Sequence, residues 1–339
     1  MRNQHPDTIF LNEVIEACNA WLECDVGLGA TSQITGDGAI KAVETHFSEL
    51  HENRPSLLVP SATYGIYSAL KAVGVKGGDT VGCPSYDWPA SYAAIKSIGA
   101  KPIILGVGSK TLTLSPESIN KCDGLNVKAV IVTHVHGIPA DVPAIRAVIG
   151  EDIAIIEDCS QALGSSLDGK PVGTMGDIAV FSFGPTKNLT AGEGGMVVCR
   201  DWELYEKMIR EVCHPVRQIV GGAGDVVHYN NFSIRPHPMT AIMLWYQLRG
   251  LNLERRCRKN ADYAKTLMNK YDICVIGNDH RRSNASSAIP AFLPSDLEEY
   301  PCECELDYTP SGAFDIKYMK PSKRKILLFR QPAFHASLN

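Results

Sequence analysis

Residues 177–200 read DIAVFSFGPTKNLTAGEGGMVVCR, in which two apolar runs flank a short polar segment. Both runs have the continuous apolar character of strands that are covered on both faces. The Gly184-Pro185 break ends the first strand, so that Lys187 leaves the sheet at its carboxyl end. Glycines at 192, 194 and 195 allow a tight return into the second strand. The stretch therefore predicts a strand, a lysine-bearing loop and a second strand.

Further upstream, short apolar runs alternate with stretches of helical period. After the first run, for example, Ile66, Leu70 and Val73 fall on one helix face. This alternation predicts an α/β fold with a mostly parallel sheet between helices. Ligands of such sheets bind at the carboxyl ends of the strands, so we look for chemistry there. The apolar runs are 56–60, 79–84, 101–107, 128–135 and 152–158.

The last third of the chain differs from the rest in its sequence pattern and composition. A helical pattern runs from Met239 to Met268, with Gly250 as its one break, and the text after residue 270 becomes irregular and rich in Pro, Ser, Glu and Tyr. We predict a large domain over residues 1–245, with residues 1–35 as an N-terminal arm. A small C-terminal α+β domain is predicted over 246–339.

Composition narrows the class of protein. The 339 residues are 45% hydrophobic and 21% charged, with a formal net charge of -4. This balance is ordinary for a globular protein and argues against a nucleic-acid or anionic-membrane partner. No apolar run approaches the roughly 20 residues of a membrane span, and the first residues lack the pattern of a secretory signal. We expect a cytoplasmic protein.

The eleven cysteines are scattered along the chain. Without a secretory signal, free thiols are the expected state. Cys302 and Cys304 resemble half of a metal site but lack a second pair at zinc-finger spacing. We predict no metal.

Polar residues follow the predicted strands where a parallel sheet binds ligands. They include one lysine, one aspartate, one tryptophan and several hydroxyls. Taken singly, each has an ordinary explanation, such as a surface lysine, a helix-capping aspartate or a core tryptophan. Together they match the needs of pyridoxal phosphate. The residues are Ser61, Thr63, Trp88, His134, His136, Asp158, Gln161, Ser182 and Lys187.

Each group has a chemical reason to be present. The Lys187 amine can condense with the cofactor aldehyde, and Asp158 can keep the pyridine nitrogen protonated. Trp88 can cover the flat ring. Backbone N–H groups at the start of the helix after Ser61, together with the Ser182 hydroxyl, suit the phosphate.

Two features near these residues need separate interpretation. His134 and His136 are two residues apart on a predicted strand and are therefore expected to share one face, either lining a site or serving the core. GSSLDGKP (164–171) imitates a phosphate-binding P-loop. Pro171 stands where that motif needs Ser or Thr, and no strand-to-helix frame surrounds it, so we reject this interpretation.

The stretch EDCSQALGSSLDGKPVGTMGDIAVFSFGPTKNLTAGEGG (157–195) resembles the signature of the DegT/StrS family of pyridoxal-phosphate sugar aminotransferases. The resemblance extends through PSATYGIYSALKAVGVKGGDTVGCPSYDWPAS (60–91) and AVIVTHVHGIPADVPAI (129–145), and covers roughly residues 38–270. It implies the type I fold of pyridoxal-phosphate-dependent transferases. It also implies a homodimer whose active sites are each built partly from the partner chain.

The resemblance assigns a role to each site residue. Lys187 would carry the internal aldimine, Asp158 would pair with the pyridine nitrogen, and Gln161 would contact the ring oxygen. Trp88 would stack on the ring. The phosphate would be held by Ala62, Thr63 and Ser182.

The resemblance also implies a reaction. Family members that are dehydratases carry His in place of the lysine, so Lys187 favours transamination. Glutamate or glutamine would give its amine to the cofactor, and a keto sugar, nucleotide-linked, or a keto cyclitol would collect it. Lys187 would move the proton. The alternatives are a pyridoxal-phosphate sugar dehydratase or lyase, and a partner subunit that binds the cofactor with little turnover.

The chain departs from the family pattern between 230 and 238. Many members carry an Asn two residues before an Arg, and that Asn reaches the partner's phosphate. Aligning on Arg235 places Ser233 at this position, where Asn230 or Asn231 would substitute. We therefore add Asn231 and Ser233 to the cofactor-binding set. The substrate-binding candidates are His136 and Arg235, and the second domain is shorter than is usual for the family.

Overall fold

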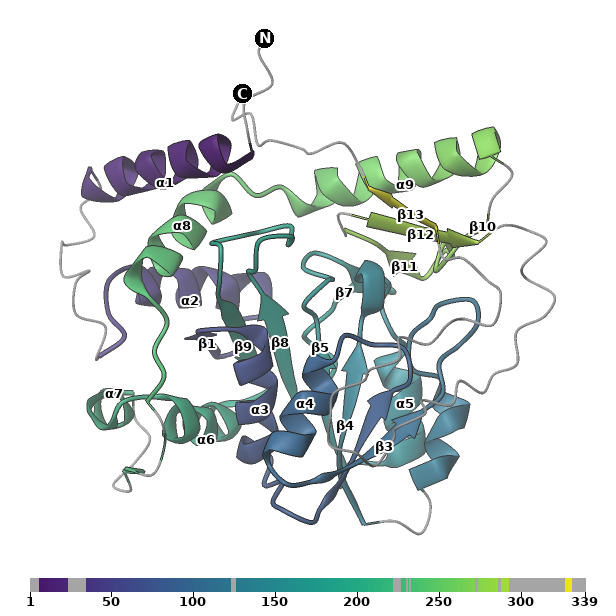
Figure 1. Ribbon diagram of the computed structural model, residues 1–339, viewed down its shortest axis with the longest axis horizontal. Helices are drawn as coiled ribbons and strands as arrows, with labels where there is room; N and C mark the ends of the chain where they lie inside the picture. Colours follow the sequence, from purple (N-terminus) through teal and green to yellow (C-terminus); the bar gives the residue numbers. More distant parts are fainter. Residues whose placement is uncertain are drawn as a thin grey trace.

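The computed structural model describes residues 6–23, 35–122, 126–221, 227–229, 231, 233–271, 274–285, 288–292 and 327–330. At its centre lies a seven-stranded sheet with the order β1-β9-β8-β5-β4-β2-β3 (Figure 1). The strands are β1 (Ser56–Val59), β2 (Thr80–Pro84), β3 (Lys101–Leu105), β4 (Val127–Thr133), β5 (Ala154–Asp158), β8 (Ile178–Ser182) and β9 (Gly195–Cys199).

The sheet is mixed but mostly parallel, as predicted. Strand β9 runs antiparallel to both of its neighbours, while β8, β5, β4, β2 and β3 pair in parallel. The difference follows from the connections. The short return through Gly192, Gly194 and Gly195 reverses the chain, whereas the parallel pairs need longer crossovers.

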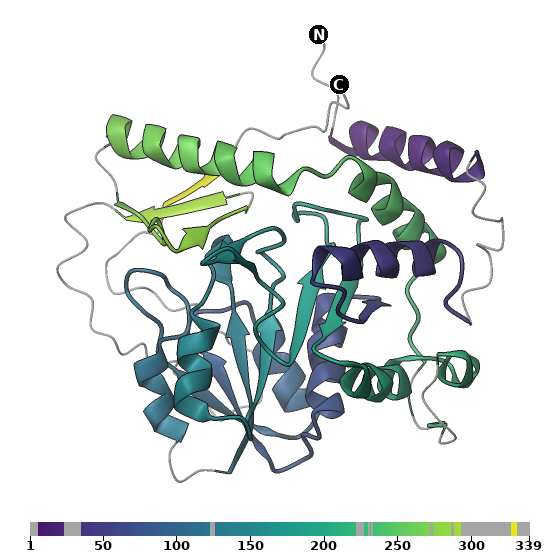
Figure 2. The ribbon, with the colours of Figure 1, turned by 180° about the vertical axis from the view of Figure 1, so that it is seen from behind.

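Helices cover both faces of the sheet (Figures 1 and 2). One face packs against α3 (Ala62–Ala72), α4 (Ala90–Ser97) and α6 (Trp202–Val212). The other face packs against α2 (Ala39–Leu50), α8 (Pro238–Arg249) and α5 (Val142–Ile149), the last with the 3-10 helix η2 (Pro116–Cys122). Because both faces are buried, the strand sequences are continuous apolar runs.

The remaining described elements lie around this core. They are α1 (Pro6–Leu22), the 3-10 helix η3 (Val135–Gly137), α7 (Pro215–Val220), α9 (Leu253–Tyr271), β6 (Ser166–Leu167), β7 (Lys170–Pro171), β10 (Cys274–Val275), β11 (Arg282–Ser283), β12 (Ala288–Phe292) and β13 (Leu327–Arg330). Helix α1 packs on α8. Strand β11 pairs with β6, while β12 lies between β10 and β13.

Two local predictions concern the P-loop look-alike and the long helical pattern around Gly250. The P-loop look-alike forms the β6–β7 hairpin, with Asp168 and Gly169 at φ 50° and 79° in its turn, so its rejection is confirmed. The long helical pattern is interrupted at Gly250, which caps α8 before α9 begins. Residue 245 lies within α8, and the division into domains 1–245 and 246–339 stays a prediction.

Other predictions concern the rest of the chain. Among the described residues, no helix is long and apolar enough to cross a membrane. Cys302, Cys304 and Asn230 lie outside the described residues.

Candidate functional site

Asp158 and Lys187 come from neighbouring parallel strands. Asp158 is the last residue of β5 and is 3% exposed, and its strand pairs with β8. Lys187 follows β8 in a turn whose backbone closes from the Lys187 N–H to the Gly184 carbonyl at 3.1 Å. Burial lowers the pKa of the Lys187 amine, and the nearby Asp158 carboxylate opposes part of that effect. The structure thus provides a half-buried amine close to a buried carboxylate.

Strand alternation shows which face of the sheet carries the site. Ile156 and Val180 belong to the core beneath α3 and α4. Asp158 is two residues beyond Ile156, and Ser182 is two beyond Val180, so both side chains point to this same face. The first turn of α3 lies there as well.

The N-terminus of α3 approaches the start of β9 closely. Ser61 caps the helix by accepting the Tyr64 N–H at 3.2 Å. A Cβ on Gly195 would lie 2.8 Å from the Ala62 nitrogen, so only glycine permits this approach. Ala62 and Thr63 are the first two residues of α3, and helix N-termini with such N–H groups bind anions.

Trp88 and Asp87 occupy the loop between β2 and α4. The Trp88 side chain is 63% exposed, as expected of a ring that covers a ligand rather than a core. Asp87 accepts hydrogen bonds from the Trp88 N–H (2.7 Å), the Ser91 hydroxyl (2.6 Å) and the Thr133 hydroxyl (2.9 Å). Burial, followed by the charge of Asp158, raises its pKa to about 7.

Asp87 is not among the site residues predicted from the sequence. The available signal was its position, because it follows β2 at the carboxyl edge where the other polar residues were collected. A role in covering the cofactor ring was predicted for its direct neighbour, Trp88, and no role was predicted for Asp87.

His136 and Gln161 meet beside this edge. The His136 N–H donates to the Gln161 side-chain oxygen at 2.8 Å, and its Nε2 lies 2.9 Å from the Tyr86 hydroxyl. His136 has a left-handed backbone (φ 52°) within η3. Burial lowers the pKa of His136 to about 4. The ring is therefore a neutral hydrogen-bonding group at physiological pH.

His134 has a different place, so the expectation that it shares a face with His136 is wrong. Strand β4 ends at Thr133, and the chain turns into η3 before the alternation can continue. His134 is fully buried, accepts the Ala140 N–H at Nδ1 and donates from Nε2 to Glu157 at 2.9 Å. It is a structural residue.

His134, Glu157 and Cys159 bring possible metal-ligand atoms within 4.8 Å of one another. Hydrogen bonds already engage both ring nitrogens and both carboxylate oxygens, the latter also receiving N–H groups of Gly173, Met175 and Gly176. We therefore expect no metal at this cluster.

The predicted residues after position 230 lie elsewhere in the chain. The Asn231 amide donates to the carbonyls of Arg210 (2.6 Å) and Cys213 (2.9 Å), at the end of α6. The Asn231 oxygen accepts the Ser233 N–H, and Ser233 has a φ of 46°. Within one chain these contacts bind the segment to α6, not to the Lys187 loop.

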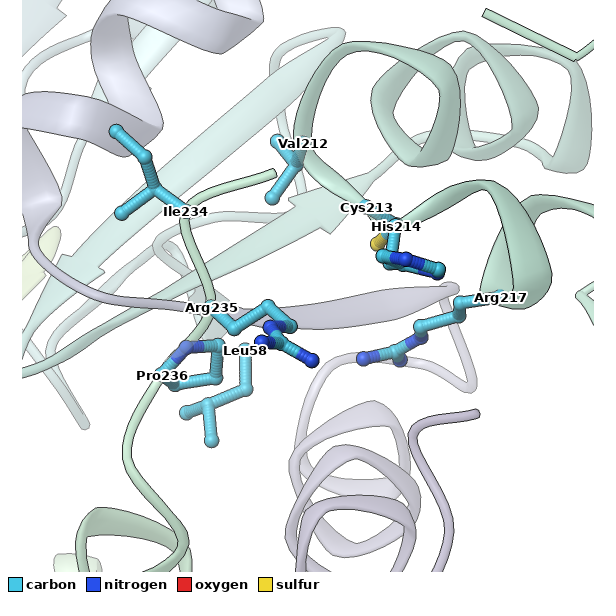
Figure 3. Close-up of a pocket in the computed structure, with 8 residues that line it drawn as sticks. All are labelled: Leu58, Val212, Cys213, His214, Arg217, Ile234, Arg235 and Pro236. Atoms are coloured by element: carbon cyan, nitrogen blue, oxygen red, sulfur yellow. The ribbon is translucent and has the colours of Figure 1, made fainter. Parts of the chain in front are cut away.

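Arg235 lines a small pocket formed by β1, the end of α6 and the start of α7 (Figure 3). Its guanidinium faces that of Arg217 across the pocket (Figure 3). Arg217 is buried and paired with Glu44 at 2.7 Å. The structure therefore gathers Lys187, Asp158, Ser182, Trp88 and the start of α3 at one edge, and keeps Arg235 apart from them in the same chain.

Known proteins resemble this chain in both sequence and fold. Residues 28–299 match the model of the DegT/DnrJ/EryC1/StrS aminotransferase family. The chain is 34% identical over 172 residues to GDP-perosamine synthase of Vibrio cholerae, covering 50% of this chain and 47% of that protein. It is 38% identical over 181 residues to Protein MosB of Rhizobium meliloti, covering 53% and 36% respectively.

The chain thus spans less than half the length of these two curated relatives. Among solved structures, 3-amino-5-hydroxybenzoic acid synthase superposes with a TM-score of 0.68 at 26% identity, over 86% of this chain and 75% of that one. The family match covers most of the chain and includes every residue of the candidate site. This protein therefore belongs to the DegT/DnrJ/EryC1/StrS aminotransferase family.

Proposed function

We propose that the protein is a pyridoxal-phosphate-dependent aminotransferase that transfers an amino group from glutamate or glutamine to a keto sugar, nucleotide-linked, or to a keto cyclitol. The observation that carries this proposal is the pair formed by Lys187 and Asp158. A half-buried lysine with a lowered pKa beside a buried carboxylate would supply both the attachment point and the ring partner of this cofactor.

The rest of the edge fits the cofactor. A Cβ on Gly195 would lie 2.8 Å from the Ala62 nitrogen, so the glycine lets the start of α3, where Ala62 and Thr63 would offer N–H groups to the phosphate, lie close against β9. Ser182 lies on the same face and adds a hydroxyl for the phosphate. Trp88 is exposed where a ring can lie against it, and Gln161 is oriented by the His136 N–H toward the same edge.

Bound pyridoxal phosphate supplies a carbonyl that takes up the amino group and a ring that withdraws electrons. Asp158 holds the proton on the ring nitrogen. Burial lowers the pKa of the Lys187 amine and so favours its uncharged form, and as a base this amine would accept a proton from the substrate carbon and return it. Neutral His136 and its partner Tyr86 provide hydrogen bonds to the acceptor.

Helix α7 and the segment after it support a homodimer with shared sites. Val216, Ile219, Val220, Tyr229 and Ile234 are large apolar side chains between 40% and 76% exposed. They flank Asn231, Ser233 and Arg235, which have no place at the Lys187 edge of their own chain. If a second copy of the chain covered this apolar surface, Arg235 and Ser233 of the first copy would approach the cofactor site of the second copy.

Localisation in the cytoplasm is part of the same proposal. Cys83, Cys159 and Cys199 are buried free thiols, and burial raises the pKa of each well above its ordinary value. Thiols in this state suit a reducing compartment.

The first experiment tests the role of Lys187. Purified protein incubated with pyridoxal phosphate should become yellow and retain the colour through gel filtration, whereas Lys187→Ala should lose it. Lys170→Ala, at an exposed position on β7, is the matched control. A wild-type protein that takes up no cofactor contradicts the proposal.

The second experiment tests the reaction. Glutamate or glutamine should convert the bound cofactor to its amine form, seen as loss of visible absorbance, and a keto-sugar acceptor should restore it. Mass spectrometry should show an aminated product. A deoxygenated product without consumption of a donor would identify a dehydratase instead, and an unchanged spectrum would identify a subunit without turnover.

A further inference from the structure

Asp87 and Asp158 both lie next to one residue, Thr133. Thr133 and Asp158 are paired across β4 and β5 in parallel register, so their side chains lie side by side on one face of the sheet. The Thr133 hydroxyl donates to Asp87 at 2.9 Å. Asp87, Thr133 and Asp158 therefore form a continuous row at the carboxyl edge of three adjacent strands, β2, β4 and β5.

The position of Asp87 is well defined. The Ser91 hydroxyl of α4 and the Trp88 N–H hold its two oxygens, so the carboxyl group is anchored between the β2 loop, α4 and β4. The titratable groups around it are Asp158, the Cys83 thiol on β2 and, beyond Asp158, the Lys187 amine. Among these described groups, Lys187 is the one cation.

We propose that Asp87 is a second carboxylate of the cofactor site, a positioning residue that adds negative charge behind Asp158 and thereby strengthens the hold on the protonated ring nitrogen of pyridoxal phosphate. This inference rests on the proposed function, because it requires that the cofactor bind at Asp158.

The physical reason is the competition between two carboxylates that share one buried face. Burial first, and then repulsion from the like charge of Asp158, keep Asp87 partly protonated near neutral pH. A cation placed at Asp158 removes that penalty and allows both groups to ionise. By the same coupling, an ionised Asp87 strengthens the attraction for the cation. The protonated ring nitrogen is therefore held more tightly when Asp87 is charged.

This coupling predicts a specific pH dependence. Above pH 7, where Asp87 is ionised, Asp87→Asn should weaken cofactor binding by about tenfold. At pH 5.5, where Asp87 is mostly protonated before binding, the loss should fall to about twofold. A merely structural role for Asp87 would give a loss of similar size at every pH.

The experiment measures the dissociation constant of pyridoxal phosphate for the apoprotein between pH 5.5 and 8.5, by quenching of tryptophan fluorescence. Thr133→Val removes one hydrogen bond to the carboxylate but keeps its charge, and should move the midpoint of the pH dependence upward. Asp79→Asn, at the opposite end of β2, is the matched control and should follow wild type.

Three outcomes decide the proposal. A ratio of variant to wild-type dissociation constants that grows through pH 7 supports it. A ratio that is constant with pH, or equal to one, overturns it while leaving the proposed function intact. Failure of wild type itself to bind is instead a failure of the proposed function. If Asp87→Asn does not fold, as judged by thermal melting, Asp87→Ser is measured by the same criteria.

Discussion

At the scale of single residues, burial decides the charge of several side chains. His51 shows this clearly. Its Nδ1 donates to the Phe47 carbonyl at 2.8 Å, and its ring contacts Phe47 and Phe181 with centroid distances of 4.7 and 4.8 Å. Loss of hydration at this site lowers the pKa of His51 to about 4. The ring is therefore built into the fold as a neutral group.

The consequence is a predicted loss of stability in acid. Unfolded histidine takes up a proton below about pH 6.5, whereas folded His51 does so only near pH 4, so the unfolded chain binds more protons in between. The free energy of unfolding should fall as pH drops through this window, by about 2 to 3 kcal/mol for His51 at pH 4.5. His136 acts in the same direction.

Urea unfolding of His51→Asn at pH 7.5 and 4.5 measures this contribution. The variant should be less stable at pH 7.5, because it loses ring packing, but its further loss on acidification should be smaller by about 2 kcal/mol. His46→Asn, within α2, the helix that His51 caps at its C-terminus, should keep the wild-type acid sensitivity. Equal acid sensitivity in His51→Asn and wild type would contradict the assignment.

At the scale of elements, the docking of α3 on the sheet shapes the phosphate end of the site. A Cβ on Gly65 would lie 2.8 Å from the Val180 side chain, and one on Gly195 would lie 2.8 Å from the Ala62 nitrogen. Because Gly65 and Gly195 have no side chains, α3 lies close to the sheet at both positions. The close approach aims the first N–H groups of α3 at the edge that carries Lys187.

Gly195→Ala should separate the two elements. The added methyl meets backbone atoms, which cannot swing away, so we expect a loss of about 1 to 3 kcal/mol in unfolding free energy. Cofactor affinity should fall as well, because the N–H groups move. Gly77→Ala, whose Cβ would meet nothing closer than 3.5 Å, is the control. Wild-type cofactor affinity in a folded Gly195→Ala protein would argue against a phosphate site here.

At the scale of the whole molecule, the region beyond α8 is hydrogen-bonded to the edge that carries Lys187. Asn188, the neighbour of Lys187, donates to the Ala285 carbonyl at 2.6 Å and accepts from Arg256 of α9 at 3.2 Å. Asn284 donates to the His136 carbonyl at 3.2 Å. Residues far apart in sequence therefore meet on both sides of the candidate site.

Asn188→Ala should release one of these ties. Removal of a part-buried hydrogen bond should cost about 1 kcal/mol of unfolding free energy. Because Asn188 adjoins Lys187, the same change should weaken cofactor retention by several-fold, measured by gel filtration of the coloured protein. Asn278→Ala, whose exposed side chain contacts Met268, is the control. A stability loss without any change in retention would show that the tie does not position Lys187.

Much of the fold was predictable because the relevant signals are local. Continuous apolar runs, helical periodicity and the Gly184-Pro185 break each depend on a few neighbouring residues, and together they predicted the sheet and the edge that carries Lys187. The chemistry of the polar residues predicted roles for Asp158 and Trp88, and the family resemblance implied the same roles together with that of Gln161. The proposed roles still await the experiments above.

Tertiary structure decided which groups meet. The order of strands in the sheet is not written in any local pattern, so the row of Asp87, Thr133 and Asp158 emerges only when β2, β4 and β5 lie side by side. The end of β4 at Thr133 also has consequences that no local pattern predicts. Beyond it, the His134 ring bonds to Glu157 and the His136 N–H donates to Gln161. Local sequence specifies where each strand ends, and packing alone specifies which ends become neighbours.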